Sequence, residues 1–337
     1  MSILYLLTSP PPPIQGTDAV YQEVAALRGA FKGEIVNLSP INTSTRRFPK
    51  QLFGFHNILT IRKLEKQSRI NHLFFTFPYA FPVLHLLRNP ILFTVTASLD
   101  VKKKPPVTER LQKLERVIVS NERDADILKA WGLTNYTIIP PGIDTANVVP
   151  SALPLGRELT LLMASAPWIS RQFDTKGIDL LLETAAKLPF LRLILLWRGV
   201  LADELKQRVE RFDLGKRVEI VNHKVDISDY LKRAHAAVLL VKDGGLVKSF
   251  PHSLFESLVA GKPVLISDTI AMADFVSNRQ CGIVVTEMTI AALVLAIERL
   301  RHNYGHLIRN AAQMGSSEFS VEKMVEKYRQ LYETLPN

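Results

Sequence analysis

The sequence predicts an α/β protein made of two doubly wound domains. Short apolar runs alternate with helix-like segments along nearly the whole chain, which is typical of parallel sheets covered by helices on both faces. The alternation restarts after Pro150, where prolines concentrate in residues 140–154 and indicate a linker. A chain of 337 residues is long enough for two cores. We therefore expect one domain at 1–150 and a second at 151–320.

The first domain is expected to contain short parallel strands joined by helices. Aliphatic and aromatic runs predict strands at Ile3–Leu7, Ile35–Leu38, His72–Phe77, Ile91–Val95, Val117–Val119 and Tyr136–Ile139. Helical spacing predicts helices from Asp18 to Phe31, over 51–70 and from Asn121 to Trp131. Gly132 is expected to end the last of these.

The second domain repeats this pattern. Its predicted strands are Leu159–Ala164, Leu191–Trp197, Val218–Val221, Ala236–Val241, Pro263–Ser267 and Gly282–Val285. Its predicted helices are Gly177–Lys187, Ala202–Phe212, Ile227–Ala234, Ser253–Ala260, Ile290–Asn303 and Val321–Thr334. Ligands of such sheets bind beyond the carboxyl ends of the strands. Two domains of this kind that face each other across a cleft would share one ligand.

Composition indicates a globular protein of a reducing compartment. Apolar residues make up 47% and charged residues 22%. The single cysteine, Cys281, begins a strand-like run, which indicates a buried thiol rather than a nucleophile. One cysteine permits no intramolecular disulfide, so a cytoplasmic location is expected. The apolar run Ile3–Leu7 stops at four prolines and is too short for a secretory signal.

The segment 248–264 is the strongest functional candidate. It reads as a loop that enters a helix near His252 or Ser253, a stop at Gly261 and then a buried strand. The amide groups of such a helix start suit an anion such as phosphate. Glu256, about one turn into the helix, is suited to accept hydrogen bonds from vicinal ribose hydroxyls. Taken alone, Glu256 also fits a solvated helix position.

Two further loops carry weaker signals. Arg171 and Lys176 lie five residues apart on a loop that follows a strand and opens a helix, so both could reach one diphosphate. Taken alone, they also fit two exposed loop cations. Gly16, before the first helix, would permit a ligand to approach the backbone closely.

In this order, the three segments resemble those of the retaining glycosyltransferases of family 4, which are group 1 glycosyltransferases. The spacing from Arg171 to Lys176-Gly177 is that of the family's Gly-Arg-Leu to Lys-Gly pattern. The segment from Glu256 to Val264 resembles the family's Glu-Ala-Met-Ala-x-Gly-x-Pro-Val. Ser120-Asn121-Glu122 and Gly142-Ile-Asp144 match further family stretches. The resemblance implies the GT-B fold, with a helix at 321–337 that packs back towards the N-terminal domain.

The resemblance also implies roles for individual residues. Arg171 and Lys176 would bind the donor diphosphate and stabilise its developing charge, as the catalytic cations. Glu256 would hold the ribose, and Gly16 would lie in the loop that closes over the donor. The backbone from His252 through Ser253 to Leu254 would cradle phosphate. Thr96 and Asp100 would lie on the acceptor side.

Two positions depart from the family pattern. Lys248 stands where the family has a glutamate, eight positions before Glu256. Thr96 stands where the family often has a histidine. We offer three interpretations of Lys248: an ion pair with an acidic donor sugar such as a hexuronic acid, a degenerate protein that binds nucleotide without transfer, or a side chain in solvent.

The resemblance implies no metal and no cofactor beyond the nucleotide diphosphate sugar. Asp124-Ala-Asp126 has the form of a metal-binding DxD, but it lies early in a predicted helix, where acidic residues favour the helix dipole. The histidines show no ligand spacing such as HExxH.

Basic residues suggest an anionic partner for the first domain. The net charge is +10, and most of the excess lies within residues 1–150. Cations cluster at 46–69, beside Phe48, Leu52, Phe53 and Phe55, and again at Lys102, Lys103 and Lys104. Basic residues interleaved with apolar ones favour an anionic membrane surface, and no recognition motif indicates nucleic acid. A solvated basic face is the alternative.

The predicted function is therefore transfer of a sugar from a nucleotide diphosphate sugar to a glycan or lipid-linked acceptor. A non-catalytic protein that binds nucleotide sugars is the main alternative. A nucleotide-sugar 2-epimerase fits the Arg171–Lys176 pair and the Glu256 segment less well.

Overall fold

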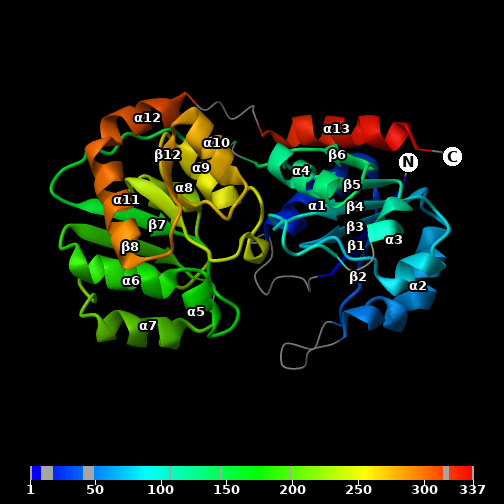
Figure 1. The fold of residues 1–337 in the computed structure, drawn as a ribbon, viewed down its shortest axis with the longest axis horizontal. Coiled ribbons are helices and arrows are strands. Elements are labelled where there is room, and N and C mark those ends of the chain that lie inside the picture. Colours follow the sequence, from blue (N-terminus) through cyan, green and yellow to red (C-terminus); the bar gives the residue numbers. More distant parts are fainter. Residues whose placement is uncertain are drawn as a thin grey trace. The chain divides into compact units, whose positions relative to one another are not determined.

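The fold comes from a computed structural model of the chain. It describes residues 2–8, 18–40, 49–105, 108–144, 146, 148–197, 199–313 and 319–335. The chain forms two compact units (Figure 1). The N-terminal unit comprises Met1–Gly142 and Phe319–Asn337, and the C-terminal unit comprises Ile143–Glu318. Gly16 lies outside the described residues, as do Arg46, Arg47 and Phe48 of the basic segment.

The described part of the N-terminal unit contains a six-stranded parallel sheet in the order β2-β1-β3-β4-β5-β6. Its strands are β1 (Ile3–Leu7), β2 (Gly33–Asn37), β3 (Ile70–Phe75), β4 (Ile91–Val95), β5 (Arg116–Val119) and β6 (Tyr136–Ile138). Every residue of β1 is buried, as expected for a central strand covered on both faces. The connecting helices are α1 (Ala19–Phe31), α2 (Ile58–Glu65), α3 (Thr108–Gln112) and α4 (Glu122–Ala130).

Two of these helices begin at side-chain caps that the sequence signalled. Asp18 Oδ1 accepts hydrogen bonds from the amides of Val20 and Tyr21, at 2.9 and 3.0 Å, and starts α1. Asn121 accepts from the amide of Asp124 at 2.9 Å and starts α4. The expected stop at Gly132 is confirmed, since this residue follows α4 with φ +87°.

The prediction of one helix over residues 51–70 is largely wrong. The structure has 3₁₀ turns η1 (Lys50–Leu52) and η2 (Phe55–Asn57), the shorter helix α2, and strand β3 from Ile70. Gly54 explains the break, because its φ is +84° and an added Cβ would lie 3.0 Å from side-chain atoms of Leu38 and Val83. A continuous helix cannot contain this backbone conformation.

The helix α13 (Val321–Glu333) completes the N-terminal unit from the far end of the sequence. Its buried residues Met324, Tyr328 and Tyr332 join the core cluster that contains Ile3 and Tyr5 of β1. Gly142 meets this helix closely: its amide lies 3.0 Å from Met324 Sδ, and an added Cβ would lie 2.9 Å from Val321 Cα. Glycine is therefore required where the chain passes α13.

The described part of the C-terminal unit also contains a six-stranded parallel sheet, in the order β12-β11-β10-β7-β8-β9. Its strands are β7 (Leu159–Met163), β8 (Leu191–Leu196), β9 (Val218–Val221), β10 (Ala236–Leu239), β11 (Val264–Ser267) and β12 (Gly282–Val285). Its helices are α5 (Gln172–Thr175), α6 (Ile178–Lys187), α7 (Ala202–Arg211), α8 (Ile227–Leu231), α9 (His252–Val259), α10 (Met272–Arg279), α11 (Ile290–His302) and α12 (Tyr304–Ala312), with the 3₁₀ turn η4 (Gly244–Leu246).

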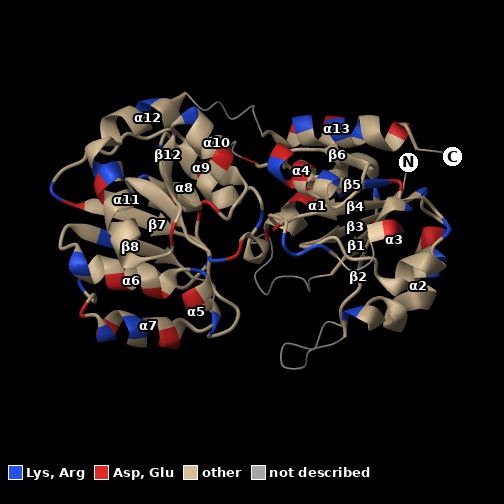
Figure 2. Cartoon of the chain, in the orientation of Figure 1, with Lys and Arg blue, Asp and Glu red and all other residues tan. Residues whose placement is uncertain are grey.

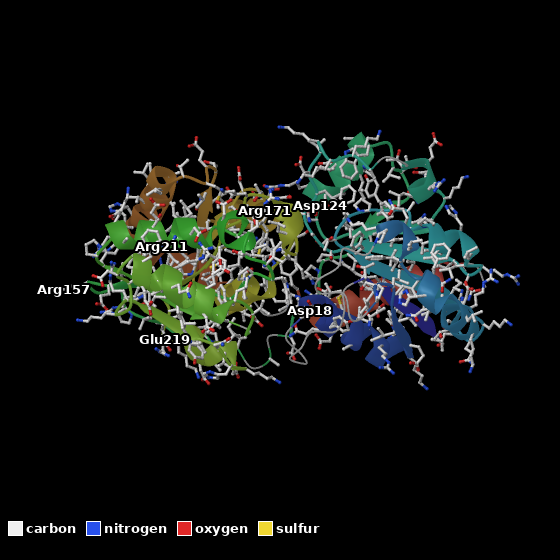
Figure 3. The ribbon with its side chains drawn as sticks, turned by 90° about the horizontal axis from the view of Figure 1, so that it is seen from below. Asp18, Asp124, Arg157, Arg171, Arg211 and Glu219 are labelled. Atoms are coloured by element: carbon white, nitrogen blue, oxygen red, sulfur yellow. The ribbon has the colours of Figure 1, made fainter. Side chains whose placement is uncertain are left out.

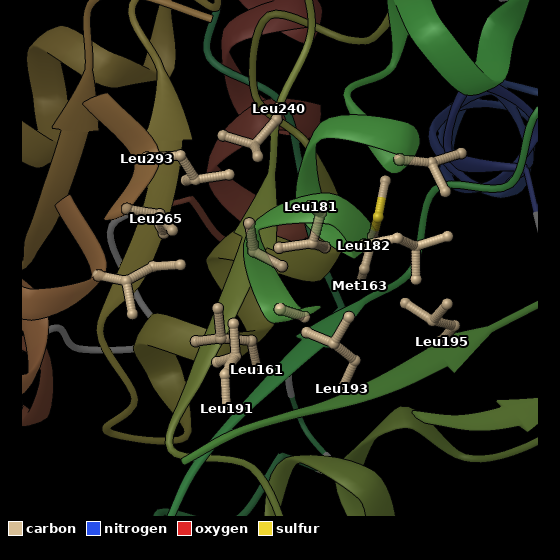
Figure 4. Close-up of a cluster of buried hydrophobic side chains, with 14 of the residues drawn as sticks. Leu161, Met163, Leu181, Leu182, Leu191, Leu193, Leu195, Leu240, Leu265 and Leu293 are labelled. Atoms are coloured by element: carbon tan, nitrogen blue, oxygen red, sulfur yellow. The ribbon is translucent and has the colours of Figure 1, made fainter. Parts of the chain in front are cut away.

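Leucine dominates the core of the C-terminal unit (Figure 4). Leu161, Leu193 and Leu265 from the sheet pack with Leu181 of α6 and Leu293 of α11 in one buried cluster. The fold class predicted from the alternating pattern is confirmed in both units. The pattern missed α3, α5, α10 and α12, of which α3 and α5 have only five and four residues. No helix in the described ranges is long and apolar enough to span a bilayer.

Candidate functional site

The candidate site lies at the switch point of the C-terminal sheet. After β7 the chain moves outward through β8 and β9, and it then returns to the other side of β7 as β10. Doubly wound sheets bind ligands at such a point, beyond the carboxyl ends of the two adjacent strands. The loop after β7 leads to Arg171 and Lys176, and the loop after β10 leads to Lys248 and α9.

Lys176 places an ammonium group directly beyond β7. Its side chain is buried, and Nζ lies 3.1 Å from the carbonyl oxygen of Ala166 and 3.4 Å from Ser165 Oγ. Ser165 and Ala166 follow the strand end at Met163 by two and three residues. Lys176 is therefore not an exposed loop cation, since its side chain is buried and its ammonium group lies beside the end of β7.

Gly177 brings this loop against the segment that follows β10. The residue has φ +62°, and an added Cβ would lie 2.7 Å from Leu240 Cβ and 3.1 Å from the Leu240 carbonyl oxygen. The amide of Lys242 donates to the carbonyl of Thr175 at 2.9 Å, and Lys242 Nζ lies 2.6 Å from Asp174 Oδ1. The predicted loop from Arg171 to Gly177 is therefore in direct contact with residues 240–242, which begin the segment leading from β10 to Lys248 and α9.

The helix α9 begins where the sequence predicted a phosphate-binding helix start. It runs from His252, and Pro251 is its N-cap with no side-chain cap. Lys248 Nζ lies 3.4 Å from His252 Nε2. Because an ammonium can only donate, Nε2 is the acceptor in this contact.

Glu256 and His252 lie on one face of α9, because they are four residues apart. Glu256 is half-buried, Ser253 is half-buried, and Leu254 is buried with its side chain in the core. The amide of Leu254 donates to the carbonyl oxygen of Pro251 at 3.2 Å, and a phosphate contact of the Leu254 backbone stays a prediction. Lys248, His252 and Glu256 form one polar row from the loop into the helix.

Arg171 is exposed and stands immediately before α5 (Figure 3). Its carbonyl oxygen accepts from the amide of Thr175 at 3.3 Å, so Arg171 opens the turn that ends at Lys176. The loop before it is also held: the amide of Trp168 donates to Gln172 Oε1 at 2.6 Å, and Ser170 Oγ lies 2.6 Å from Glu204 Oε1.

The predicted acceptor-side residues belong to the N-terminal unit. Thr96 is buried directly after β4, and its amide donates to the carbonyl of Phe75 at 2.9 Å. Asp100 is half-exposed and accepts from the amide of Lys102 at 3.0 Å. The acceptor-side role of Thr96 and Asp100 stays a prediction.

Asp124 of the DxD sequence has a structural role within the N-terminal unit (Figure 3). It is 1% exposed, and its carboxylate accepts from the amide of Leu99 at 2.8 Å and from Asn121 Nδ2 at 2.7 Å. The carboxylate thus ties α4 to the loop that carries Thr96 and Asp100. No group of three His, Cys, Asp or Glu side chains in the described ranges could hold a metal ion.

Sequence reasoning missed the residues that shape the loop after β10. Ser267 Oγ accepts from the amide of Val241 at 3.0 Å, and Thr269 Oγ1 donates to the carbonyl of Val241 at 2.8 Å. Ser267 is the last residue of the neighbouring strand β11, and Thr269 lies two residues further along the chain. Two hydroxyl residues at the end of a buried strand were the available signal.

One part of the chain matches a known protein family. Residues 166–316 match the family model described as glycosyl transferases group 1. The resemblance to the group 1 glycosyltransferases is confirmed. The matched segment contains Arg171, Lys176, Lys248 and Glu256 but not Gly16, Thr96 or Asp100. A search of curated protein sequences finds no match.

Solved glycosyltransferase structures share the fold over nearly the full chain. Sucrose-phosphate synthase from Thermosynechococcus elongatus matches with a TM-score of 0.73 and 17% identity, covering 99% of this chain and 98% of that chain. HepE from Anabaena, solved with UDP, matches at 0.73 and 15% identity over 99% and 100%. WaaG, a glycosyltransferase involved in lipopolysaccharide biosynthesis, matches at 0.69 and 14% identity over 97% and 99%. The expected GT-B fold of two Rossmann-like domains is confirmed.

Proposed function

We propose that the protein is a retaining, metal-independent glycosyltransferase that moves a hexose-type sugar from a nucleotide diphosphate donor to a hydroxyl of a glycan or glycolipid. The observation that carries the proposal is the junction at the switch point. The buried ammonium of Lys176 lies beyond β7, and the β10 loop that leads to α9 and Glu256 is hydrogen-bonded to the same turn.

Ligand complexes of proteins with a similar fold support the donor class. HepE has been solved with UDP and with UDP-glucose. TarM from S. aureus, which matches 82% of this chain, has been solved with UDP and α-GlcNAc-glycerol. In our proposal the diphosphate lies at Lys176, Arg171 and the start of α9, and the ribose hydroxyls donate to Glu256.

The reaction then needs little proton chemistry from side chains. The acceptor hydroxyl attacks the anomeric carbon from the face that the diphosphate leaves, so the new C–O bond keeps the configuration of the old one. A leaving phosphate oxygen takes the hydroxyl proton. Arg171 and Lys176 stabilise the negative charge that develops on the diphosphate, which is the role a metal ion has in other transferases.

A thermal-shift panel tests the donor site. We expect nucleotide diphosphates and their sugars to raise the melting temperature without magnesium, because a ligand at a hundredfold excess over its Kd stabilises by roughly 2.7 kcal/mol. Arg171→Ala and Glu256→Ala should abolish the shift, and Arg211→Ala, at an exposed arginine of α7 in the same unit, should keep it. No shift with any nucleotide would contradict the proposed site.

The same panel separates two interpretations of Lys248. If Lys248 pairs with an acidic sugar, donors that carry a hexuronic acid should bind more tightly than neutral donors, and equal binding would contradict this.

The second candidate function, a protein that binds nucleotide sugars without transfer, is favoured by Lys248 and Thr96, which replace the family's glutamate and histidine. Detection of intact sugar on an added acceptor excludes this candidate and an epimerase together.

The acceptor and the cellular location remain part of this proposal. We expect a cytoplasmic protein whose acceptor is presented at an anionic membrane, with the basic segment 46–69 and Lys102–Lys104 as contacts. Nucleic acid is not expected as a partner.

A further inference from the structure

Three large apolar side chains are exposed in one short segment of the N-terminal unit. Leu52, Phe55 and Leu59 are 48%, 39% and 82% exposed. They lie on η1, η2 and α2, which we call the η1–α2 segment (residues 49–66). Single exposed apolar residues are ordinary, but three within eight positions form a surface that needs an explanation.

Cations share the outer face of α2 with the most exposed leucine. Arg62 and Lys63 follow Leu59 by three and four residues, so they lie beside it on the helix surface. Arg62, Lys63 and Lys66 are all exposed, as is Lys50 on η1. Figure 2 draws these Lys and Arg residues blue.

The opposite face of α2 is held firmly to the body of the unit. Ile61 is fully buried in the core. Phe53 stacks on Phe81 with ring centroids 5.7 Å apart, so it belongs to this inner face and not to the exposed apolar set. The inner side of the segment therefore packs on the core, and Leu52, Phe55 and Leu59 lie on its outer surface.

The one acidic residue of the segment is turned inward. Glu65 is 5% exposed, and its Oε1 accepts from Asn71 Nδ2 at 2.8 Å and from the amides of Arg88 and Asn89 at 2.7 and 3.0 Å. These hydrogen bonds hold the Glu65 carboxylate, and with it the end of α2, against the rest of the unit. Within the described residues of the segment, the exposed charge is entirely positive.

We propose that the η1–α2 segment docks on an anionic lipid bilayer, with Leu52, Phe55 and Leu59 inserted at the headgroup boundary and the four cations against lipid phosphates. Exposed leucines beside exposed cations, with the acid removed from the surface, match an interface that is apolar inside and negative outside. A nucleic-acid backbone would use the cations but would leave Leu52 and Leu59 in water. This inference rests on the proposed function, in which docking would bring the protein to a lipid-linked acceptor.

Co-sedimentation of the full chain with vesicles tests the proposal. We expect binding to phosphatidylcholine vesicles that contain phosphatidylglycerol, weakening with added salt, and little binding to phosphatidylcholine alone. Leu59→Ser and the double variant Arg62→Gln/Lys63→Gln should each weaken binding, the double variant by about tenfold or more. Both change exposed side chains, so folding should be retained.

Matched controls lie on the other unit. Leu295→Ser removes a leucine that is 65% exposed on α11, and Arg211→Gln/Lys216→Gln removes two exposed cations. Both should bind vesicles like the unaltered protein. All variants should keep the nucleotide-dependent thermal shift, so a failure here is distinct from failure of the donor site. Equal vesicle binding by Leu59→Ser and the unaltered protein, or binding of nucleic acid but not of vesicles, would overturn the proposal.

Discussion

Lys262 is the residue whose burial is hardest to reconcile with its charge. It directly precedes Pro263 and β11 and is 0% exposed. Its Nζ has no hydrogen-bond partner among the described residues. Burial lowers the pKa of the ammonium from 10.5 to about 8. The folded protein therefore holds this proton less tightly than the unfolded chain does.

The depressed pKa of Lys262 makes the free energy of unfolding depend on pH. Between pH 8 and 10.5 the unfolded chain binds more protons at Lys262, so the contribution of this residue to stability should rise with pH across that window. Lys262→Met should remove the rise and increase the free energy of unfolding at pH 7 by about 1–3 kcal/mol. Urea unfolding at pH 7 and pH 10 measures both effects. The exposed-residue variant Lys216→Met should change neither, and an unchanged or lower stability of Lys262→Met would contradict the assignment.

At the scale of elements, the site depends on how two loops meet. The turn of α5 that ends at Lys176 and the segment after β10 are joined through Gly177, Leu240 and Lys242. Neither loop would be placed by its own strand alone, because several residues separate each strand end from the functional side chain. The backbone contact sets the separation between Lys176 and the β10 segment.

Gly177→Ala tests this contact. The new Cβ would meet Leu240 at 2.7 Å in a backbone conformation that favours glycine, so we expect a loss of about 1–3 kcal/mol in stability and weaker nucleotide binding. Gly199→Ala is the matched control, since φ there is +87° but an added Cβ meets nothing within 4 Å. Gly199→Ala therefore has the backbone strain of a positive φ without a steric clash. If both variants lose stability and nucleotide binding equally, the contact with Leu240 does not hold the site.

Regular elements and local motifs could be predicted because their signals are local. The continuous aliphatic runs of β1 and β8, and the Asn121 cap of α4, lie within a few residues of the structure they specify. The break at Gly54 could not be predicted, because it results from packing against Leu38 and Val83. Spacing alone predicts Lys176 and Glu256 as site residues, whereas the Asp174–Lys242 ion pair could not be predicted before the two loops were placed.

At the scale of the molecule, the N-terminal unit is built from both ends of the chain. His72 of β3 contacts Tyr332 Oη through Nδ1 at 2.8 Å and Thr94 Oγ1 through Nε2 at 2.7 Å. Thr94 Oγ1 in turn lies 3.0 Å from Tyr328 Oη. This buried polar network links the central strands to α13. Burial lowers the pKa of His72 from 6.5 to about 3, so the ring stays neutral in the folded state at neutral pH.

Removing one hydroxyl should weaken this link. Tyr332→Phe leaves His72 Nδ1 buried without its partner, and we expect a loss of about 1–3 kcal/mol, read as a lower thermal unfolding temperature. Tyr79→Phe, at a half-buried tyrosine of the same unit, should have little effect. Because His72 must gain a proton on unfolding below pH 6.5, its contribution to stability should be complete above that pH and lost as the pH falls towards 3. An unchanged unfolding temperature for Tyr332→Phe would contradict the role of the network.

The late position of α13 has a consequence for the order in which the protein is made. Domains commonly fold as they leave the ribosome, first the one encoded first. Here the C-terminal unit is continuous and is complete once residue 318 has emerged, whereas the N-terminal unit must wait for its last helix. Until then Tyr5, His72 and Phe74 lack the aromatic partners that cover them. The half of the protein synthesised first is therefore finished last, and a chain that stops before α13 would release an unfinished N-terminal unit beside a completed C-terminal one.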